Sequence, residues 1–345
     1  MAFHIIRELP SSDEILEELP LPEELKAVKK ERDKTISAVI RGESSIFLVI
    51  VGPCSAHDVD AVCEYVSRLS RVQEKVKDTL LLIPRIYTNK PRTLGTGYKG
   101  MLHQPNPMEK PNIVEGIKSL RKMHIRALKE SHLSAADEML YPNNYPYVED
   151  LLSYVAIGAR SVANQQHRLT VSGLDIPVGM KNPTSGEIFV MLESIYAAQH
   201  PHVFIYNNYE VKTDGNPLAH GTLRGAVNHS GMRVPNYHYE DLLRISSLYL
   251  KKELKNPSLI VDVNHDNSNK HYEEQPRIAM EIMKSRAHNE MLKKVIKGLM
   301  IESYLVAGRQ EPDGTVFGQS ITDPCLGWDD TEHLLFRIAE EVARS

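Results

Sequence analysis

The sequence of 345 residues has few of the features that would place it outside the cell or in a membrane. Its three cysteines, Cys54, Cys63 and Cys325, are too few and odd in number for the disulfide framework of a secreted protein. Residues 1–45 are rich in charged side chains and contain no long apolar run, so they predict neither a signal peptide nor a membrane span. A reducing, cytoplasmic location without a membrane partner is therefore expected.

The chain also lacks a strong charge of either sign. With a formal net charge of −4 and a pI of about 6.4, no general attraction to nucleic acid is expected. The P-loop, HExxH, GxSxG and CxxC motifs are absent from the sequence. Gly95, Gly97 and Gly100 spell GxGxxG, but they trail the preceding apolar run and run into MLHQPNP, so they predict a loop and no dinucleotide site.

What the chain does contain is a series of eight short apolar runs, most of them followed by a plausible helix. This alternation predicts a parallel α/β architecture, and eight units favour a closed (β/α)8 barrel, or TIM barrel, over an open doubly wound sheet. The runs lie at 46–51, 80–83, 135–140, 154–159, 176–180, 202–206, 259–263 and 297–303.

Residues 1–45 precede this series and predict an N-terminal helical extension. Pro22 suits the first turn of a helix that runs to about Ile40, with Gly42 just past its end. The apolar residues of this helix form one stripe, so it should pack on the main domain or on a second subunit. We therefore divide the chain into an extension with oligomer contacts, residues 1–45, and a barrel, residues 46–345.

A basic stretch, IPRIYTNKPRTLGTGYKG, follows the second apolar run. Lys90, Arg92 and Lys99 would lie on the loop that leaves this strand. Taken alone, such a cluster is more often a solvated surface than a binding site. In a barrel, however, chemistry gathers where strands end, and several of the other runs also end in unusual polar residues.

Four of these polar residues have side chains that bind metals: Cys54, His265, Glu302 and Asp323. The alternatives for each are a buried structural cysteine, a satisfied core histidine, and carboxylates that cap helices or face water. Asp262 and Asn264 lie near enough in the sequence to orient the His265 ring. Together a thiolate, an imidazole and two carboxylates suit Mn, Fe, Co or Zn better than Ca or Mg, and such an ion could act as a Lewis acid on a carbonyl oxygen.

Cations also end several runs and could surround a small dianion such as a phosphoryl group. Charge-assisted donors from separate strands would be needed for this, and an ordinary surface salt bridge is the alternative for each residue. The residues concerned are Arg85, Arg160, Lys181 and Arg224.

The order and spacing of several motifs resemble the type I alpha 3-deoxy-D-arabino-heptulosonate 7-phosphate (DAHP) synthases. The motifs are GPCSAHD, PRIYTNKPRT, IGARS, GMKN, TLRGA, NHDNSNK, ESYL and SITDPCLGW, and they span nearly the whole chain. The resemblance implies a (β/α)8 barrel with an N-terminal extension. It also implies a transferase that condenses phosphoenolpyruvate with D-erythrose 4-phosphate and water, the first step of the shikimate pathway.

The resemblance further implies a role for each matched residue. One divalent metal ion, with Mn favoured and Fe, Co or Zn possible, would be bound by Cys54, His265, Glu302 and Asp323. Phosphoenolpyruvate would contact Arg85, Lys90, Arg160, Lys181 and Arg224, and erythrose 4-phosphate would contact Pro91, Arg92 and Thr93, with Lys90 reaching both. Lys90 would protonate the aldehyde oxygen, while Glu138 and Lys181 would orient the attacking water; with His265 these are the implied catalytic residues.

Regulation and assembly are predicted on the same basis. In feedback-inhibited relatives an aromatic amino acid binds against a hairpin between the positions of Lys181 and Arg224, and this chain looks shorter there. Weak or absent inhibition by Phe, Tyr or Trp is therefore expected. The resemblance also implies a homodimer or homotetramer.

Three other functions are consistent with parts of the pattern. A 3-deoxy-octulosonate 8-phosphate synthase would share the fold but take arabinose 5-phosphate, and the KPRT motif favours the four-carbon sugar. A barrel that only binds an effector would not need the complete set of metal and substrate residues. A metal-dependent aldolase that uses a simple enolate is the third alternative.

Overall fold

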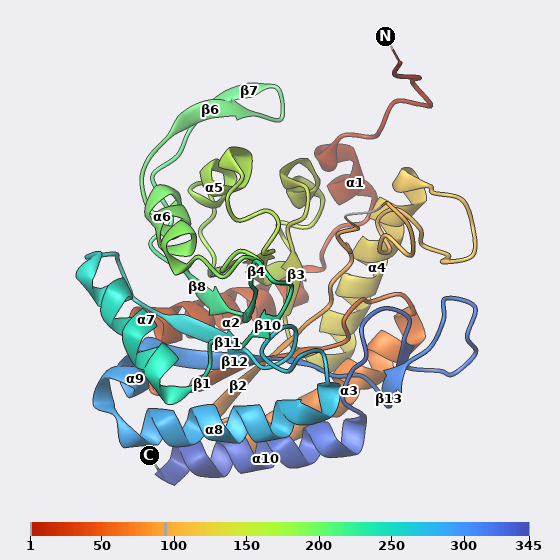
Figure 1. The fold of residues 1–345 in the computed structure, drawn as a ribbon. Coiled ribbons are helices and arrows are strands. Elements are labelled where there is room, and N and C mark those ends of the chain that lie inside the picture. Colours follow the sequence, from red (N-terminus) through yellow and green to blue (C-terminus); the bar gives the residue numbers. More distant parts are fainter. Residues whose placement is uncertain (1, 93–94, 345) are drawn as a thin grey trace.

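In the computed structural model, which describes residues 2–92 and 95–344, eight parallel strands form a barrel surrounded by helices (Figure 1). Neighbouring strands follow the order β2-β1-β12-β11-β8-β5-β4-β3, and a parallel bridge between Arg85 and Ala136 joins the two ends. The strands are β1 Phe47–Gly52, β2 Leu80–Pro84, β3 Ala135–Glu138, β4 Leu152–Ile157, β5 Val178–Lys181, β8 Ala219–Leu223, β11 Leu259–Asp262 and β12 Ile296–Glu302. The predicted (β/α)8 fold is confirmed.

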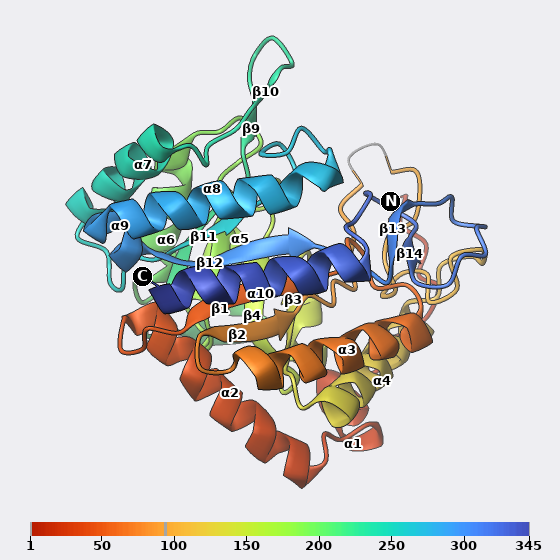
Figure 2. The ribbon, with the colours of Figure 1, turned by 90° about the horizontal axis from the view of Figure 1, so that it is seen from below.

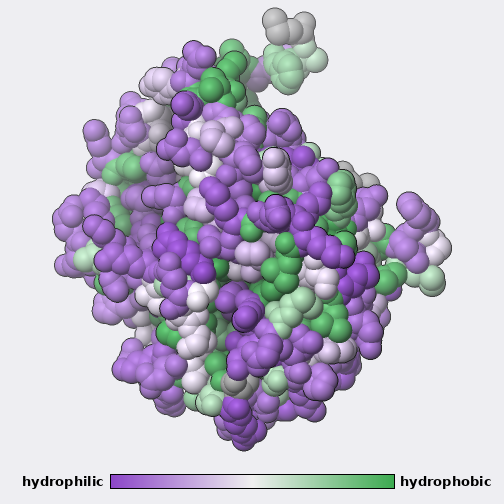
Figure 3. Space-filling view, turned by 90° about the vertical axis from the view of Figure 1, so that its left-hand side faces the viewer, coloured by the Kyte–Doolittle hydropathy of each residue, from purple (hydrophilic) through white to green (hydrophobic). Residues whose placement is uncertain are grey.

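The barrel strands are covered on both sides, which explains their continuous aliphatic sequences. Ile50, Ile260 and Met300 pack inside the barrel, whereas Val49 and Val261 pack outward against the helices. The surrounding helices are α3 Val59–Val76, α4 Ile113–Ser131, α5 Gln165–Val171, α6 Ile188–Ala198, α7 Tyr239–Lys251, α8 Gln275–His288, α9 Glu290–Val295 and α10 Trp328–Arg344. The face shown in Figure 3 is mainly hydrophilic, with small separate apolar patches. Within residues 2–92 and 95–344, no helix has the length and apolar character needed to span a bilayer.

One predicted barrel strand is wrong. The predicted run 202–206 contains β6 (Val203–Tyr206), which pairs with β7 (Tyr209–Lys212) in an antiparallel hairpin outside the barrel (Figure 1). The barrel strand is β8, whose sequence AHGTL is weakly apolar but fully buried. Its small residues are needed because a Cβ at Gly221 would lie 2.7 Å from a Leu259 methyl carbon. The apolar residues of β6, in contrast, are exposed or half-buried, so hydrophobicity alone identified the wrong segment.

The N-terminal extension contains α1 (Ser12–Glu18) and the predicted long helix, α2 (Glu23–Arg41), which ends at Gly42 with φ 78°. Ile36, Val39 and Ile40 of α2 join the apolar cluster inside the barrel. Ser258, which precedes β11, donates a hydrogen bond to the Ile40 carbonyl. The helix therefore closes the end of the barrel where strands begin, and the opposite rim is left for polar loops.

Candidate active site

The carboxyl ends of the barrel strands surround a cavity of about 290 Å³. Because all eight strands run in the same direction, residues that end different strands meet at this rim. The predicted residues that line the cavity are Cys54, Arg85, Lys90, Pro91, Arg92, Glu138, Arg160, Lys181, Arg224, His265 and Asp323. Glu302, at the end of β12, is buried close to this cavity, and Thr93 lies outside the described residues.

The four predicted metal-binding residues come together at one side of the cavity. Ligand atoms of Cys54, Glu302 and Asp323 lie within 4.8 Å of one another. Cys54 Sγ donates a hydrogen bond to Asp323 Oδ2 at 3.3 Å. His265 Nε2 lies 3.7 Å from Glu302 Oε1. A thiol, an imidazole and two carboxylates are thus close enough to share one small ion.

This donor set fits a divalent cation. Glu302 Oε1 is buried and has no hydrogen bond of good geometry from any residue that the structure describes, although Arg85 Nη2 lies 2.9 Å away as an ion pair. The Lys90 ammonium lies beside two of the other predicted metal-binding residues, 2.5 Å from Cys54 Sγ and 3.0 Å from Asp323 Oδ2. The space among these four side chains therefore attracts a positive charge. Its sulfur, nitrogen and oxygen donors suit a metal ion of borderline softness.

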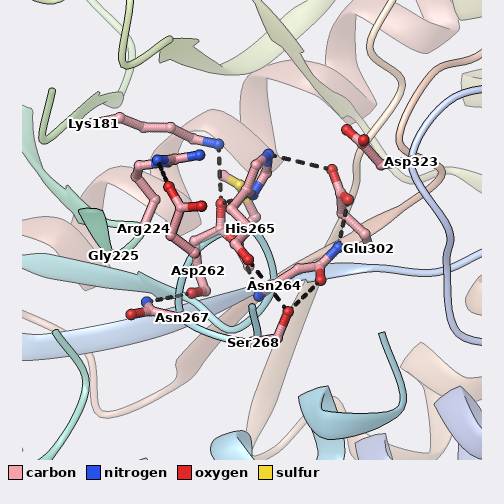
Figure 4. Close-up of polar contacts among 12 residues, drawn as sticks. Lys181, Arg224, Gly225, Asp262, Asn264, His265, Asn267, Ser268, Glu302 and Asp323 are labelled. Carbon is pink, nitrogen blue, oxygen red and sulfur yellow. Dashed lines mark hydrogen bonds and ion pairs between the residues drawn. The ribbon is translucent and has the colours of Figure 1, made fainter. Parts of the chain in front are cut away.

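A sharp turn after β11 presents His265. The residue has φ 48°, in the left-handed region that non-glycine residues rarely adopt. The Asn264 N–H donates to Asp262 Oδ1 at 3.0 Å and stabilises this turn. His265 Nδ1 lies 2.8 Å from Asp262 Oδ2, so the other ring nitrogen is directed toward Glu302 (Figure 4).

Among the described residues, the Asn264 side-chain amide makes its hydrogen bond to Glu302 and not to the His265 ring, so its predicted role is wrong. Its side-chain amide donates to Glu302 Oε2 at 2.6 Å and so orients this carboxylate (Figure 4). Asp262 does have the predicted role, and it also accepts a hydrogen bond from Lys181 Nζ at 3.0 Å. Burial opposes ionisation of Asp262, but the charges of His265 and Lys181 outweigh it and hold its pKa well below the usual range.

The charge of Lys90 changes the pKa values of the predicted metal-binding residues around it, and they change the pKa of Lys90. Burial favours the neutral amine, but Cys54 and Asp323 outweigh this effect and raise the pKa of Lys90 above its ordinary value. Lys90 in turn lowers the pKa of Asp323 well below its usual range. Burial, reinforced by Glu302, raises the pKa of Cys54 to about 12. Lys90 and Asp323 therefore form a charged pair beside the buried Cys54 sulfur.

The cations on the other side of the cavity differ in their pairing. Lys181 contacts Asp262, and Arg224 Nη1 donates to Asp266. Arg160 has no carboxylate partner among the described residues. Glu138 lies against the turn that carries Arg160, because a Cβ at Gly158 would lie only 2.1 Å from Glu138 Oε1. The site thus combines paired and open cations, an arrangement that suits a multiply charged anion.

Two further cations in the cavity lining, Arg233 and Lys270, were missed. Neither follows a predicted strand directly, so the sequence offers no signal that separates them from surface charges. The structure brings Arg233 to Asp266 at 3.0 Å and Lys270 to Asp323 at 3.4 Å.

The structural role of Asp137 was also missed. Its carboxylate accepts hydrogen bonds from the Thr88 N–H at 2.9 Å and from the Glu138 N–H at 2.6 Å, and so links the basic loop to β3.

Comparison with known proteins gives matches over nearly the whole chain. Residues 24–336 match the model of the DAHP synthetase I family. A phospho-2-dehydro-3-deoxyheptonate aldolase of Haemophilus influenzae is 37% identical over 336 residues, which cover 95% of this chain and 90% of that protein. The Phe-sensitive phospho-2-dehydro-3-deoxyheptonate aldolase of Escherichia coli is 35% identical, with 98% and 95% covered. The solved phospho-2-dehydro-3-deoxyheptonate aldolase structure from Francisella tularensis has a TM-score of 0.90 and 32% identity, and the match covers 99% of each chain.

Proposed function

Because the chain belongs to the DAHP synthetase I family, we propose that it condenses phosphoenolpyruvate with D-erythrose 4-phosphate and water to give DAHP and phosphate. Enzymes of this family carry out the first step of the shikimate pathway, and the chain is an enzyme of that class, a 3-deoxy-7-phosphoheptulonate synthase. The observation that carries the proposal is the cluster of Cys54, Glu302 and Asp323 beside a cation-lined cavity.

The proposed cofactor is one divalent metal ion, with Mn favoured and Fe, Co or Zn as alternatives. Cys54, His265, Glu302 and Asp323 would hold it, since their ligand atoms are close together and chemically suited to it. When bound, the ion would supply Lewis acidity toward the aldehyde oxygen of the sugar phosphate.

Phosphoenolpyruvate carries a carboxylate and a phosphate, so it needs several cations from different directions. We assign these contacts to Arg85, Lys90, Arg160, Lys181 and Arg224, all of which line the cavity. Pro91 and Arg92 are assigned to erythrose 4-phosphate. Arg92 Nε donates to the Tyr98 carbonyl at 2.8 Å, which fixes the guanidinium. Its two other nitrogens have no hydrogen-bond partner among residues 2–92 and 95–344 and are proposed to bind a phosphate.

In the proposed reaction the methylene carbon of phosphoenolpyruvate attacks the aldehyde carbon of the sugar and forms the new C–C bond. Lys90 delivers a proton to the aldehyde oxygen as it becomes an alkoxide. Water held by Glu138 and Lys181 adds to the neighbouring enolpyruvyl carbon, which has become electron-poor, and loses a proton. Phosphate then leaves by cleavage of its C–O bond, the new hydroxyl on that carbon gives up its proton to become the ketone, and the arginines stabilise the charge of the phosphate.

Phosphoenolpyruvate consumption should be measured with erythrose 4-phosphate and with arabinose 5-phosphate, with and without a chelator. We expect turnover with erythrose 4-phosphate, at least about 100-fold lower kcat/KM with arabinose 5-phosphate, and loss of activity with the chelator that Mn restores. Preference for arabinose 5-phosphate would indicate an octulosonate synthase. If neither sugar supports turnover after metal is restored, the chain is a binding protein.

Weak feedback inhibition is also proposed. The segment between Lys181 and Arg224 does contain a hairpin, β6–β7. The short length of this segment is therefore not enough by itself to predict weak inhibition. Next to the hairpin lies a cavity of about 540 Å³, larger than the strand-end cavity but without its metal-binding and catalytic residues. Its charged lining has three acids and two bases: Glu149, Asp175, Asp214, Arg41 and Lys212. A net negative lining disfavours the carboxylate of an amino acid.

Activity should therefore be measured with Phe, Tyr and Trp added separately. We expect less than about twofold inhibition at roughly 1 mM of each, which corresponds to dissociation constants of about 1 mM or weaker. Strong inhibition by any one of them at lower concentration would show that the cavity accepts an aromatic amino acid despite its acids.

Residues 1–45 are proposed to contribute to a homodimer or homotetramer. Phe3, Ile5 and Ile6 are 91%, 94% and 88% exposed, and a second copy of the chain could cover these apolar side chains. Light scattering of the full chain would give the mass of the assembly, and a monomer would contradict the proposal.

All three cysteines are free thiols, which supports a reducing, cytoplasmic location.

A further inference from the structure

One wall of the cavity is not used by the proposed mechanism. After β8 the chain forms an antiparallel hairpin, β9 (Ala226–Val227) and β10 (Arg233–Val234), which projects away from the barrel (Figure 2). Val227 and Arg233 of this hairpin line the cavity. The Val227 N–H donates to the Thr184 carbonyl at 2.7 Å and ties the hairpin to the loop after β5. The hairpin thus brings an additional guanidinium to the cavity.

Arg233 shares a carboxylate with Arg224. Arg233 Nε donates to Asp266 Oδ1 at 3.0 Å, and Arg224 Nη1 donates to Asp266 Oδ2. Both oxygens of Asp266 are therefore engaged, one by each guanidinium. Arg224 and Asp266 alone would be a neutral pair, and the carboxylate would repel a phosphoryl group. With Arg233 the three residues carry one net positive charge, which favours an anion.

The backbone segments that carry the two arginines and Asp266 are held together. Asn182 Oδ1 accepts hydrogen bonds from the Arg224 N–H at 2.9 Å and from Asn236 Nδ2 at 3.2 Å. The Asn236 N–H donates to Asn267 Oδ1 at 2.8 Å, and Asn267 follows Asp266 directly. Gly225, with φ 75°, lies so close to the Asp266 loop that a Cβ on it would be 2.7 Å from the Asn267 backbone nitrogen. This network holds the hairpin base and the Asp266 loop in one arrangement.

Arg233 retains donors for a ligand. Its Nε binds Asp266 and its Nη1 makes a long contact of 3.4 Å to the Asn269 carbonyl. Its Nη2 has no hydrogen-bond partner among the residues that the structure describes, and the side chain is 40% exposed. A guanidinium anchored at one edge and open at another can bind phosphate oxygens with two parallel hydrogen bonds.

We propose that Arg233 is a further phosphate-binding residue, which acts with Arg224 on the phosphoryl group of phosphoenolpyruvate. Asp266 is a positioning residue that holds both guanidiniums. The inference rests on the proposed function, in which Arg224 binds phosphoenolpyruvate. The β8 loop lies opposite the β2 loop in the ring of eight strands, so Arg233 and Arg92, which is assigned to the sugar phosphate, enter the cavity from opposite sides.

The test is steady-state kinetics of Arg233→Ala and Arg233→Lys, with each substrate varied while the other is saturating. For Arg233→Ala we expect a KM for phosphoenolpyruvate about tenfold or more above that of the unmodified enzyme, as for loss of a charge-assisted hydrogen bond. The KM for erythrose 4-phosphate should stay within about twofold, since Arg233 is assigned to the phosphoryl group of phosphoenolpyruvate. Arg233→Lys should recover part of the loss.

His229→Ala, at the exposed tip of the same hairpin, is the matched control and should leave both KM values unchanged. An unchanged KM for phosphoenolpyruvate in Arg233→Ala, or an equal rise in both KM values, would overturn the inference. Failure of the proposed function is a separate result, because the unmodified enzyme would then be inactive with these substrates.

Asp266→Asn tests the positioning role. The loss of positioning should outweigh the loss of the carboxylate's repulsion. Asp266→Asn should therefore raise the KM for phosphoenolpyruvate in the otherwise unmodified enzyme, and by a smaller factor in Arg233→Ala, because part of its effect passes through Arg233. Equal factors in the two backgrounds would contradict positioning of Arg233 by Asp266. The thermal unfolding midpoint should be measured for each variant, and a fall in the midpoint accompanied by a rise in both KM values would indicate a purely structural role.

Discussion

Replacing Lys90 with alanine is expected to reduce kcat by about 10³-fold or more, while the protein still binds a divalent metal ion. The Lys90 ammonium lies beside Cys54 and Asp323, where it can reach an oxygen that develops negative charge next to the metal. Its pKa is raised by these two neighbours, so at neutral pH it carries the proton that the alkoxide needs. The measurements are kcat from phosphoenolpyruvate consumption and metal content after dialysis.

Lys99→Ala is the matched control for this variant. Lys99 is on the same loop, and its carbonyl accepts a hydrogen bond from the Lys90 N–H, but its side chain does not line the cavity. It should retain most of the activity. Lys90→Arg keeps the charge but gives up a proton far less readily, so it should also be nearly inactive. Near-normal turnover in Lys90→Ala would show that another group protonates the aldehyde oxygen.

Replacing Cys54 with alanine is expected to weaken metal binding on the order of 10²-fold and to remove activity at limiting metal concentration. Cys54 supplies the sulfur of the proposed ligand set, and its side chain is fully buried beside Glu302 and Asp323. Two carboxylates and an imidazole would remain, a weaker set for a borderline metal. Titration with Mn and metal content after dialysis measure the effect.

Cys63→Ala is the control for loss of a buried thiol. Cys63 lies in α3, is equally buried, and is not part of the metal-binding cluster. This variant should lose some stability through a small cavity but keep its metal affinity. If Cys54→Ala binds metal as tightly as Cys63→Ala does, Cys54 is not a ligand.

Much of the fold could be predicted because barrel strands are buried on both faces. Segments such as β1 and β11 read as continuous aliphatic runs for that reason, and the polar residues that follow them mark the functional rim. β8 could not be predicted, because close packing there requires small residues and leaves a weak apolar signal. The exposed apolar strand β6 took its place in the prediction.

The sequence by itself determined the fold class, every barrel strand except β8, the long helix α2 and many of the polar residues that end the strands, since these follow from local periodicity and from motifs read in order. Only the tertiary structure decided which side chains share a charge or a ligand. Cys54 and Asp323 are 269 positions apart, and Arg233 and Asp266 are 33 apart, yet each pair is in contact. Such pairings depend on where the loops of different strands meet around a closed barrel, and no local pattern records that distance.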